Sequence, residues 1–225
     1  MFILQKNHLN FDETQLPVFV QSVSRHQYGK KVTLKDKIAT GDYKVMEFPN
    51  GFYGYVSNYI LNEDFELELS LPKEGYMALH INQIQAGSEF SMSINNKAVS
   101  YDDKVVTAIF LTAGDDNFLL SGSKGACVNR LKIMIPKTWL AKNIASYNES
   151  LLNTYLDMGE ERLFLDAMDN TYRSMVDKVM NTEDNAFYLS ITQNIIAVIT
   201  ERFFDRLNIK MQKNQKGNEA SRRSA

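Results

Sequence analysis

Hydrophobic and polar residues alternate most clearly between residues 65 and 84. Over residues 65–71 every second side chain is phenylalanine or leucine, and glutamate or serine lies between them. This period of two is typical of a strand with one buried face. After turn-forming residues at 72–75, residues 76–82 place Met, Leu and Ile on one face and an aromatic and polar set on the other. We therefore predict two antiparallel strands, the second with a face suited to lining a ligand pocket.

Further strand signals fill most of residues 42–136. Asn95-Asn96 predicts the turn of a hairpin in which Met92 faces Val99, because this register puts bulky apolar pairs on one face. About seven or eight short strands follow one another at spacings typical of β-sandwiches and β-barrels. The first 136 residues are therefore predicted to form mainly antiparallel β-structure.

After Pro136 helical spacing replaces the alternation. A short helix is predicted to begin at Trp139-Leu140, and three further helices are predicted at residues 149–157, 166–180 and 186–207. The last of these is apolar over more than half of its circumference, more than one contact face of a monomer would bury. We therefore predict a homodimer formed through this helix. The candidate interface residues form two alternative stripes: Ile195, Ile199 and Phe203, or Ile196 and Phe204.

The two ends of the chain differ from the middle in composition. Residues 1–40 are predicted to be an extended arm or irregular edge, since residues 30–37 are too charged for a central strand. Residues 208–225 hold five lysines and arginines against one glutamate, a net charge of +4, and few large apolar side chains, so a flexible linker is predicted. We divide the chain into a β-domain with an N-terminal arm at 1–136, a helical dimerisation subdomain at 137–207 and a linker at 208–225.

Composition narrows the class of protein only slightly. The 225 residues are 44% hydrophobic and 23% charged, as in ordinary globular domains, and the net charge of −2 gives no general attraction to nucleic acid. The sequence shows neither a membrane span nor a signal peptide. A single cysteine, Cys127, excludes an internal disulfide framework and suits a reducing compartment. We expect a cytoplasmic protein without membrane association.

Catalytic and metal-binding patterns are weak. Of the three histidines, His8, His26 and His80, only His80 lies in the predicted barrel, and neither a suitably spaced glutamate nor a later histidine accompanies it. The chain therefore lacks the pattern of three imidazoles and one carboxylate that holds a catalytic metal in cupins. Cys127 has no histidine near it in the sequence, and residues 121–125 lack the spacing of a phosphate-binding loop. We predict no cofactor, no metal site and no enzymatic activity.

A row of tyrosines is the most informative chemical feature. Aromatic residues pack well on pleated sheets, so packing alone is one interpretation of the row. The other is a small-molecule pocket with apolar walls and hydroxyl groups for hydrogen bonding. His80, on the same predicted face as Tyr76, is either a hydrogen-bonded wall residue or a ligand contact. The candidate ligand-binding residues are Tyr53, Tyr55, Tyr59, Tyr76 and His80.

The order of these parts resembles the N-terminal half of AraC-family transcription regulators. The resemblance is carried by the last predicted strand and short helix, CVNRLKIMIPKTWL, and by the long helix, YLSITQNIIAVITERFFDRL. It implies an α+β fold with an antiparallel cupin-like β-barrel, or double-stranded β-helix, followed by a helical subdomain. It also implies effector binding in the barrel and dimerisation through helices. The family's two helix-turn-helix motifs are absent, so DNA is expected as a partner only through a domain outside this sequence.

Two other classes remain as alternatives. The first is a stand-alone module that binds a carbohydrate or another small molecule. The second is a cupin-type enzyme, such as an isomerase or dioxygenase. It is less favoured because Gly75-x4-His80-x-Asn82 departs from the cupin metal motif and no histidine follows position 80. The identity of the effector is not encoded in any motif of the sequence.

Overall fold

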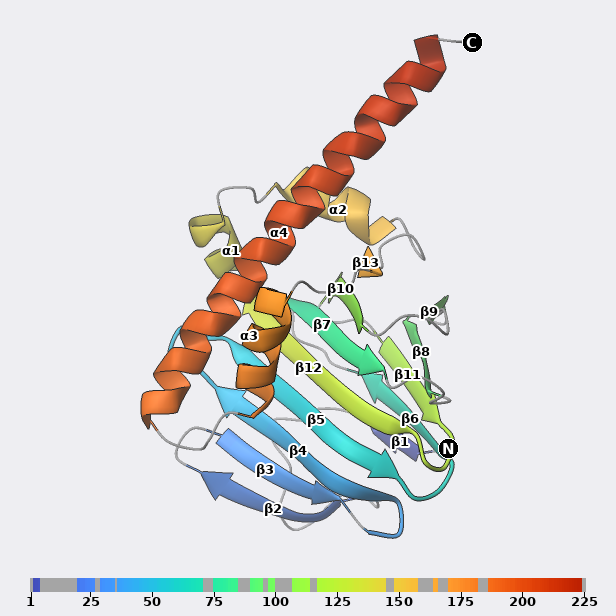
Figure 1. Ribbon diagram of the computed structural model, residues 1–225, viewed down its shortest axis with the longest axis vertical. Coiled ribbons are helices and arrows are strands. Elements are labelled where there is room, and N and C mark those ends of the chain that lie inside the picture. Colours follow the sequence, from blue (N-terminus) through green and yellow to red (C-terminus); the bar gives the residue numbers. More distant parts are fainter. Residues whose placement is uncertain are drawn as a thin grey trace.

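The computed structural model describes residues 2–4, 20–26, 29–34, 36–70, 75–84, 90–94, 97–99, 107–113, 117–144, 148–157, 164–165, 170–181 and 186–223. The fold is α+β: strands occupy most of the first 136 residues and helices most of the remainder, as predicted (Figure 1). No helix in these segments is both long and apolar enough to cross a membrane.

The larger sheet has eight strands, and every neighbouring pair in it is antiparallel. Strand β12 lies between β5 and β7, and all three are interior strands, with a paired strand on either side. The spatial order is β13 (Phe164–Leu165), β10 (Thr107–Ala113), β7 (Tyr76–Ile84), β12 (Cys127–Pro136), β5 (Tyr53–Leu61), β4 (Ala39–Glu47), β3 (Gly29–Leu34) and β2 (Val20–His26).

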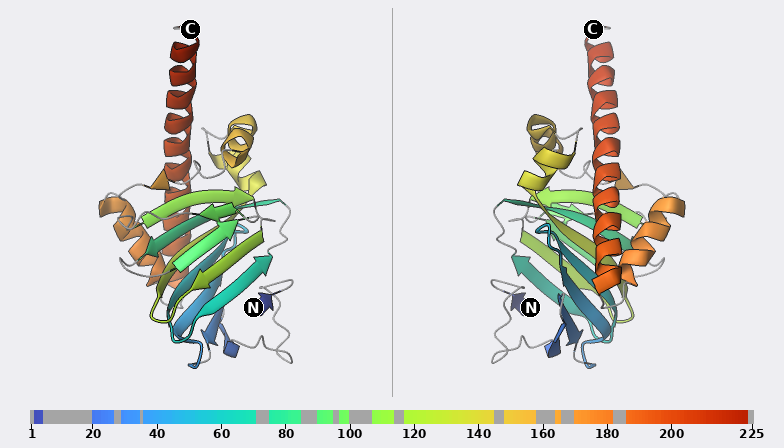
Figure 2. Two further views of the ribbon diagram at one scale, coloured as in Figure 1. Left: turned by 90° about the vertical axis from the view of Figure 1, so that its right-hand side faces the viewer. Right: turned by 90° about the vertical axis from the view of Figure 1, so that its left-hand side faces the viewer.

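The smaller sheet has five strands, in the order β1 (Phe2–Leu4), β6 (Phe65–Ser70), β11 (Asn117–Gly122), β8 (Phe90–Ile94) and β9 (Lys97–Val99). Only the β1–β6 pair is parallel among the described pairs. The two sheets form separate layers, with β1 on the side away from α3 (Figures 1 and 2). The described strands form two open sheets, so closure into a cupin-like barrel stays a prediction.

The two strands predicted between residues 65 and 84 are present as β6 and β7. They are not paired with each other, however, because β6 belongs to the smaller sheet and β7 to the larger one. Gly75, with φ of 81°, adopts the left-handed conformation just before β7, which glycine tolerates best. The chain thus passes from one sheet to the other between β6 and β7, and the two strands do not form a hairpin.

The predicted hairpin around Asn95-Asn96 is confirmed in its register. Met92 of β8 faces Val99 of β9, and Ile94 faces Lys97. Met92 and Ile94 are both buried, as expected for the apolar face of a strand.

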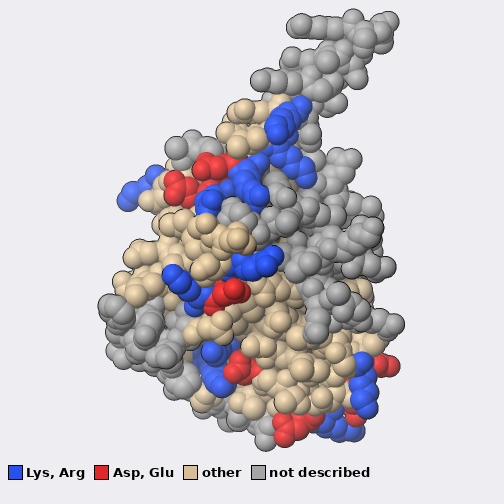
Figure 3. All heavy atoms as spheres, in the orientation of Figure 1, with Lys and Arg blue, Asp and Glu red and all other residues tan. Residues whose placement is uncertain are grey.

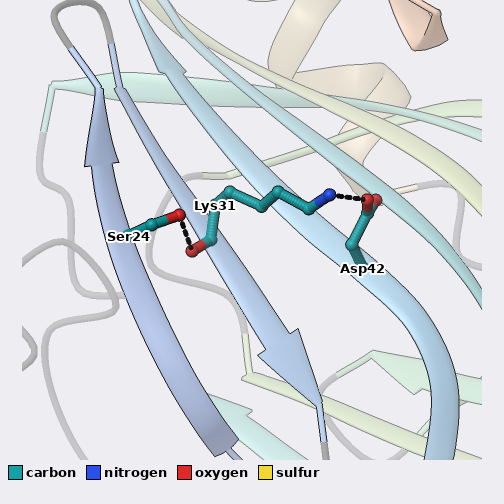
Figure 4. A network of polar contacts seen from close by, with 3 residues as sticks. All are labelled: Ser24, Lys31 and Asp42. Carbon is teal, nitrogen blue, oxygen red and sulfur yellow. Dashed lines mark hydrogen bonds and ion pairs between the residues drawn. The ribbon is translucent and has the colours of Figure 1, made fainter.

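The prediction for residues 1–40 needs correction, because β2 and β3 are regular strands and β3 lies between β2 and β4. Val32 and Leu34 on β3 are buried, whereas Lys31 lies on the opposite face. There its Nζ forms an ion pair with Asp42 Oδ2 at 2.8 Å, and Ser24 Oγ donates to the Lys31 carbonyl at 3.4 Å (Figure 4). An interior strand therefore accommodates lysine where one of its faces is open to solvent.

The described residues also form four helices: α1 (Lys137–Asn143), α2 (Glu149–Asp157), α3 (Asn170–Met180) and α4 (Ala186–Arg223). The main core forms where these helices meet one face of the larger sheet. Leu79 and Ile133 from the strands pack in the same cluster as Val176, Ile199 and Phe203 from α3 and α4. Helix α4 crosses the body and projects beyond it (Figures 1 and 2).

The prediction that residues from Asn208 onward lack regular structure is wrong, because α4 continues as one helix to Arg223. Met211 is still buried in the main core, so the helix remains attached to the body for one turn beyond Leu207. Beyond it, the segment contains no proline and a single glycine, and it is rich in residues with good helix propensity. Extending an existing helix requires no new nucleation, so polar residues suffice.

Candidate ligand-binding face

The larger sheet has two faces with different chemistry. Along β7, Met77, Leu79 and Ile81 point into the core beneath the helices. The intervening residues Ala78 and His80 point to the opposite side, which we call the inner face. At one end of this face, Leu61 of β5 packs with Phe65 of β6, so the smaller sheet lies against it.

Cross-strand neighbours share a face, so the strand register identifies the members of the inner face. These residues come from β4, β5, β7, β10 and β12, and they combine aromatic, hydroxyl, amide and basic side chains. They include Tyr43, Tyr53, Tyr55, Ser57, Tyr59, Tyr76, Ala78, His80, Asn82, Phe110, Thr112, Arg130, Lys132 and Met134, and the same register adds the buried apolar residues Val45, Ala108 and Val128.

All five residues predicted to bind ligand lie on the inner face, although the structure does not gather them into one cluster. Tyr53 and Tyr76 meet, with ring centroids 6.1 Å apart, and Tyr76 Oη donates to the Gly51 carbonyl at 3.3 Å. Tyr55 is buried beside them in the same small apolar cluster. Tyr59 lies near the other end of β5 and packs with Leu61 instead.

His80 is fully buried on the inner face. Its Nε2 lies 2.9 Å from Thr112 Oγ1, within hydrogen-bonding distance. Its ring stacks on Phe110, with centroids 4.7 Å apart and planes 5° from parallel. Both contacts come from β10, the neighbouring strand, so the imidazole is held in one orientation.

Two basic residues that the sequence analysis did not single out lie on the same face. Arg130 and Lys132 of β12 retain only 6% and 4% of their exposure. Lys132 is the register neighbour of His80 on one side and Tyr55 on the other, and its Nζ lies 4.5 Å above the Tyr55 ring. Arg130 is flanked by Asn82 of β7 and Ser57 of β5.

The sequence does carry a partial signal for these two residues. Arg130 and Lys132 alternate with Leu131 and Ile133, a pattern that normally indicates a strand with one face in water. Only the packing of a second sheet against β12's layer turns the polar face into an interior one. Because that packing joins residues far apart in the sequence, alternation alone could not identify a buried basic pair.

Burial raises the pKa of several tyrosines on the inner face. For Tyr55 burial is the largest cause, followed by the neighbouring Tyr53. Burial also raises the pKa of Tyr43 and of Tyr59, and in both the positive charge of Arg130 acts in the opposite direction. These phenols therefore stay neutral at physiological pH and keep their hydroxyl groups as hydrogen-bond donors.

The raised pKa of Tyr55 predicts a loss of stability at alkaline pH. Above pH 10 the unfolded chain releases this proton first, so its contribution to stability is complete below pH 10 and is lost as the pH rises. Between about pH 10.5 and 12 we expect the free energy of unfolding of the wild type to fall faster than that of Tyr55→Phe. The expected difference is about 1.4 kcal/mol per pH unit.

Urea unfolding followed by circular dichroism at several pH values measures both slopes. The other tyrosines titrate in both proteins, so the difference reports Tyr55 together with its effect on the pKa of Tyr43. Equal slopes for wild type and Tyr55→Phe would show that the Tyr55 phenol ionises as easily in the folded chain as in the unfolded one.

The side chains of the inner face are of the kinds that line small-molecule sites. Aromatic rings provide contact surface, and hydroxyl, amide and basic groups provide hydrogen bonds and charge. Within the described residues, no three His, Cys, Asp or Glu side chains are grouped so as to hold a metal ion. Compared with known families and curated proteins, the chain matches no family model and no curated protein.

The structure corrects the choice of dimer-interface residues on α4. Ile196, Ile199, Phe203 and Phe204 are buried in the chain's own core, so they present almost no surface to a second copy. Ile195 is only partly buried and packs at the edge of that core. Dimerisation itself stays a prediction.

Three large aliphatic residues of α4 are exposed instead: Ile191, Val198 and Ile209. Their spacings of 7 and 11 residues place them within about 20° of one line along the helix. In Figure 3 basic side chains, with acidic ones beside them, lie over the middle part of α4. We call Ile191, Val198 and Ile209 the α4 stripe.

Proposed function

We propose that this chain is the ligand-sensing and dimerisation domain of an AraC-type transcription regulator. In this proposal, binding of a small-molecule effector controls DNA binding by a helix-turn-helix domain that is not part of this sequence. The observation that carries the proposal is the set of buried polar side chains on the inner face. His80, Asn82 and Thr112 each retain 2% of their exposure or less, and Arg130 and Lys132 little more.

Burying such groups is costly unless they form specific interactions. An uncompensated polar group costs about 1–3 kcal/mol in a protein interior, and a charged one costs more. A face needed only for packing would be more stable with apolar side chains. The opposite face of the same strands has such side chains, for instance Leu79 and Ile133. Polar groups among aromatic rings between two sheets are the usual composition of a small-molecule site.

The arrangement of the two sheets supports a cupin-like barrel as the site's scaffold. Most strand pairs are antiparallel, and Phe65 joins the small sheet to the large one at Leu61. In the proposed fold the effector lies between the sheets, against β5, β7 and β12. The helical subdomain then follows the last barrel strand directly, since α1 begins at Lys137.

Contacts between the inner-face strands and the helices support a sensor over a passive binding module. The backbone N–H of Leu111, between Phe110 and Thr112 on β10, donates to Tyr155 Oη of α2 at 3.0 Å. The Tyr155 ring in turn meets Phe203 of α4 edge to face, with centroids 6.3 Å apart. A shift of β10 on ligand binding would reach α4 through these contacts.

A metabolite library screened by thermal unfolding tests the proposed function. We expect at least one small molecule to raise the unfolding midpoint of the chain, because a ligand that binds only the folded state stabilises it. Asn82→Leu, on the inner face, should raise the dissociation constant of that molecule at least tenfold and so reduce the shift of the midpoint. Asn58→Leu makes the same replacement at an exposed position of β5 and serves as the control. Hits that are equally sensitive to both replacements would place binding elsewhere.

The regulatory part of the proposal needs a second measurement. The chain fused to the helix-turn-helix domain of an AraC-family regulator should bind that domain's operator with an affinity that changes when the hit is added. Ligand binding without any such change would favour the stand-alone binding module.

A further inference from the structure

Strand β10 connects the inner face with the core beneath the helices. Phe110 and Thr112 lie on the inner face, where the Phe110 ring stacks on His80 and Thr112 Oγ1 lies 2.9 Å from His80 Nε2. Leu111, the residue between them, packs in the main core. Because side chains of a strand alternate between its two faces, a shift of β10 at the inner face also moves Leu111 in the core.

The outer edge of β10 is covered first by a strand and then by a side chain of α2 (Figure 1). Among the described residues, β13 pairs with β10 at Ala108 and Ile109. The N–H groups of every second residue in a strand point to the same neighbour, so the Leu111 N–H belongs to the same edge as that of Ile109. There it donates to Tyr155 Oη at 3.0 Å. A hydroxyl group of α2 therefore takes the place of a strand partner.

We propose that the hydrogen bond between Leu111 and Tyr155 is the contact through which the inner face regulates α4. This inference rests on the proposed function and names the regulatory contact of its site. Leu111 and Tyr155 are both completely buried. If β10 moved and Tyr155 did not follow, the Leu111 N–H would lose its acceptor in the protein interior, which is costly. The Tyr155 ring, and α2 with it, therefore follows β10.

Packing carries the movement from Tyr155 to α4. The Tyr155 ring meets Phe203 edge to face at 6.3 Å between centroids, and Phe203 meets Phe204 in the same way at 5.7 Å. A close-packed interior has few voids in which one ring could move alone. Movement of Tyr155 therefore shifts Phe203 and the part of α4 around it. The α4 stripe, at which a second copy is predicted to bind, belongs to the same helix.

The directionality of a hydrogen bond makes this contact more sensitive to a shift than the apolar contacts near it. A hydrogen bond weakens steeply as its angle departs from linearity, whereas burial of apolar surface has no preferred direction. Tyr172 of α3 provides a comparison, because its hydroxyl group is also on a buried ring. Tyr172 Oη donates to the Ile199 carbonyl at 3.5 Å, so this hydrogen bond joins two helices rather than a strand and a helix.

Hydrogen exchange of the whole chain, without ligand or operator DNA, tests the inference. Thr112→Val keeps the shape of the side chain and removes the hydroxyl group that contacts His80. In the otherwise wild-type chain we expect this replacement to speed exchange over residues 196–207 of α4 about threefold or more, relative to β3 and β4. In a Tyr155→Phe chain the same replacement should leave exchange over residues 196–207 unchanged, because the hydrogen bond between β10 and α2 is already absent.

Tyr172→Phe is the matched control, since it removes the same group from another buried tyrosine. In a Tyr172→Phe chain, Thr112→Val should still speed exchange in α4. Circular dichroism checks that each variant folds. Phe110→Leu removes the ring that stacks on His80 and replaces Thr112→Val if that variant does not fold. If Tyr155→Phe does not fold, the helices are compared, and Thr112→Val should speed exchange more in α2 than in α3.

The outcomes separate this inference from the proposed function. An equal response of α4 in the wild-type and Tyr155→Phe backgrounds would overturn the inference, because the shift would then reach α4 by another route. So would the absence of any response of α4 to changes on β10. Neither result bears on whether a small molecule binds, which the library screen decides. Conversely, a failed screen or operator-binding measurement would leave the contact between β10 and α4 intact and remove its regulatory meaning.

Discussion

Phe203→Ala is expected to lower the free energy of unfolding by about 3–5 kcal/mol, as large-to-small replacements in a well-packed core do. Phe203 is 2% exposed at the place where α4 meets the sheet. Its ring contacts Tyr155 of α2 and Phe204 edge to face, at 6.3 and 5.7 Å between centroids. Removing the Phe203 ring leaves a cavity between α2 and α4 that movement of the two helices cannot fill completely.

Urea unfolding followed by circular dichroism and Trp139 fluorescence measures the loss. Ile60→Ala is the control, because Ile60 is a large aliphatic residue that is 49% exposed on β5. Its replacement should cost less than about 1 kcal/mol. A similar small cost for Phe203→Ala would mean that α4 does not pack on the sheet as described.

The strands could largely be predicted because alternation is a local property. The patterns at residues 65–71 and 76–82 correspond closely to β6 and β7, and the register of Met92 with Val99 follows from the turn between them. The pairing of β6 with β1 and β11 could not be predicted, since it joins segments far apart in the sequence. Sheet partners depend on the packing of the whole chain.

The candidate site was predictable in part for the same reason. Tyr55 and His80 were recognisable from their residue types and from the face they share with other aromatic and polar residues. Arg130 and Lys132 were not, because a strand's own sequence does not reveal which of its faces a second sheet will cover. Their charges predict an exposed face, and only the topology shows that the face is buried.

The amphipathic pattern of α4 posed a similar problem. Apolar residues around most of the helix led to the prediction of a second contact, with another subunit, but periodicity could not say which residues face the chain's own sheet. The structure assigns Ile196, Ile199 and Phe203 to the core and leaves Ile191, Val198 and Ile209 exposed. Residues beyond Leu207 were read as a linker because they lack apolar periodicity, yet they continue a helix already formed.

Val198→Glu is expected to raise the dissociation constant of the predicted homodimer about 100-fold or more. Val198 is 43% exposed at the middle of the α4 stripe, with Ile191 and Ile209 on either side along the same line. A stripe about 27 Å long at 1.5 Å per residue suits pairing with a second copy of the helix. The three side chains are only about half exposed, so burying each gains about half of the 1.5–3 kcal/mol of a fully exposed one. Micromolar association therefore also needs contacts from the side chains of α4 that flank the stripe.

Two-fold symmetry doubles the effect of the substitution, because the interface then contains two glutamates, one from each subunit. Two carboxylates would then be desolvated close together, which costs several kcal/mol. The protomer should stay folded, since Val198 lies outside the buried core cluster. Ile60→Glu places the same charge at an equally exposed aliphatic residue of β5 and should leave the dimer intact.

Sedimentation equilibrium at tens of micromolar protein, a concentration suited to micromolar dissociation constants, distinguishes monomer from dimer in all three proteins. The expected result is a dimer for the wild type and Ile60→Glu and a monomer for Val198→Glu. A monomeric wild type would rule out dimerisation by this chain at such concentrations. A dimer that survives Val198→Glu would place the interface away from the α4 stripe, since a symmetric contact through that line cannot bury two glutamates without losing most of its affinity.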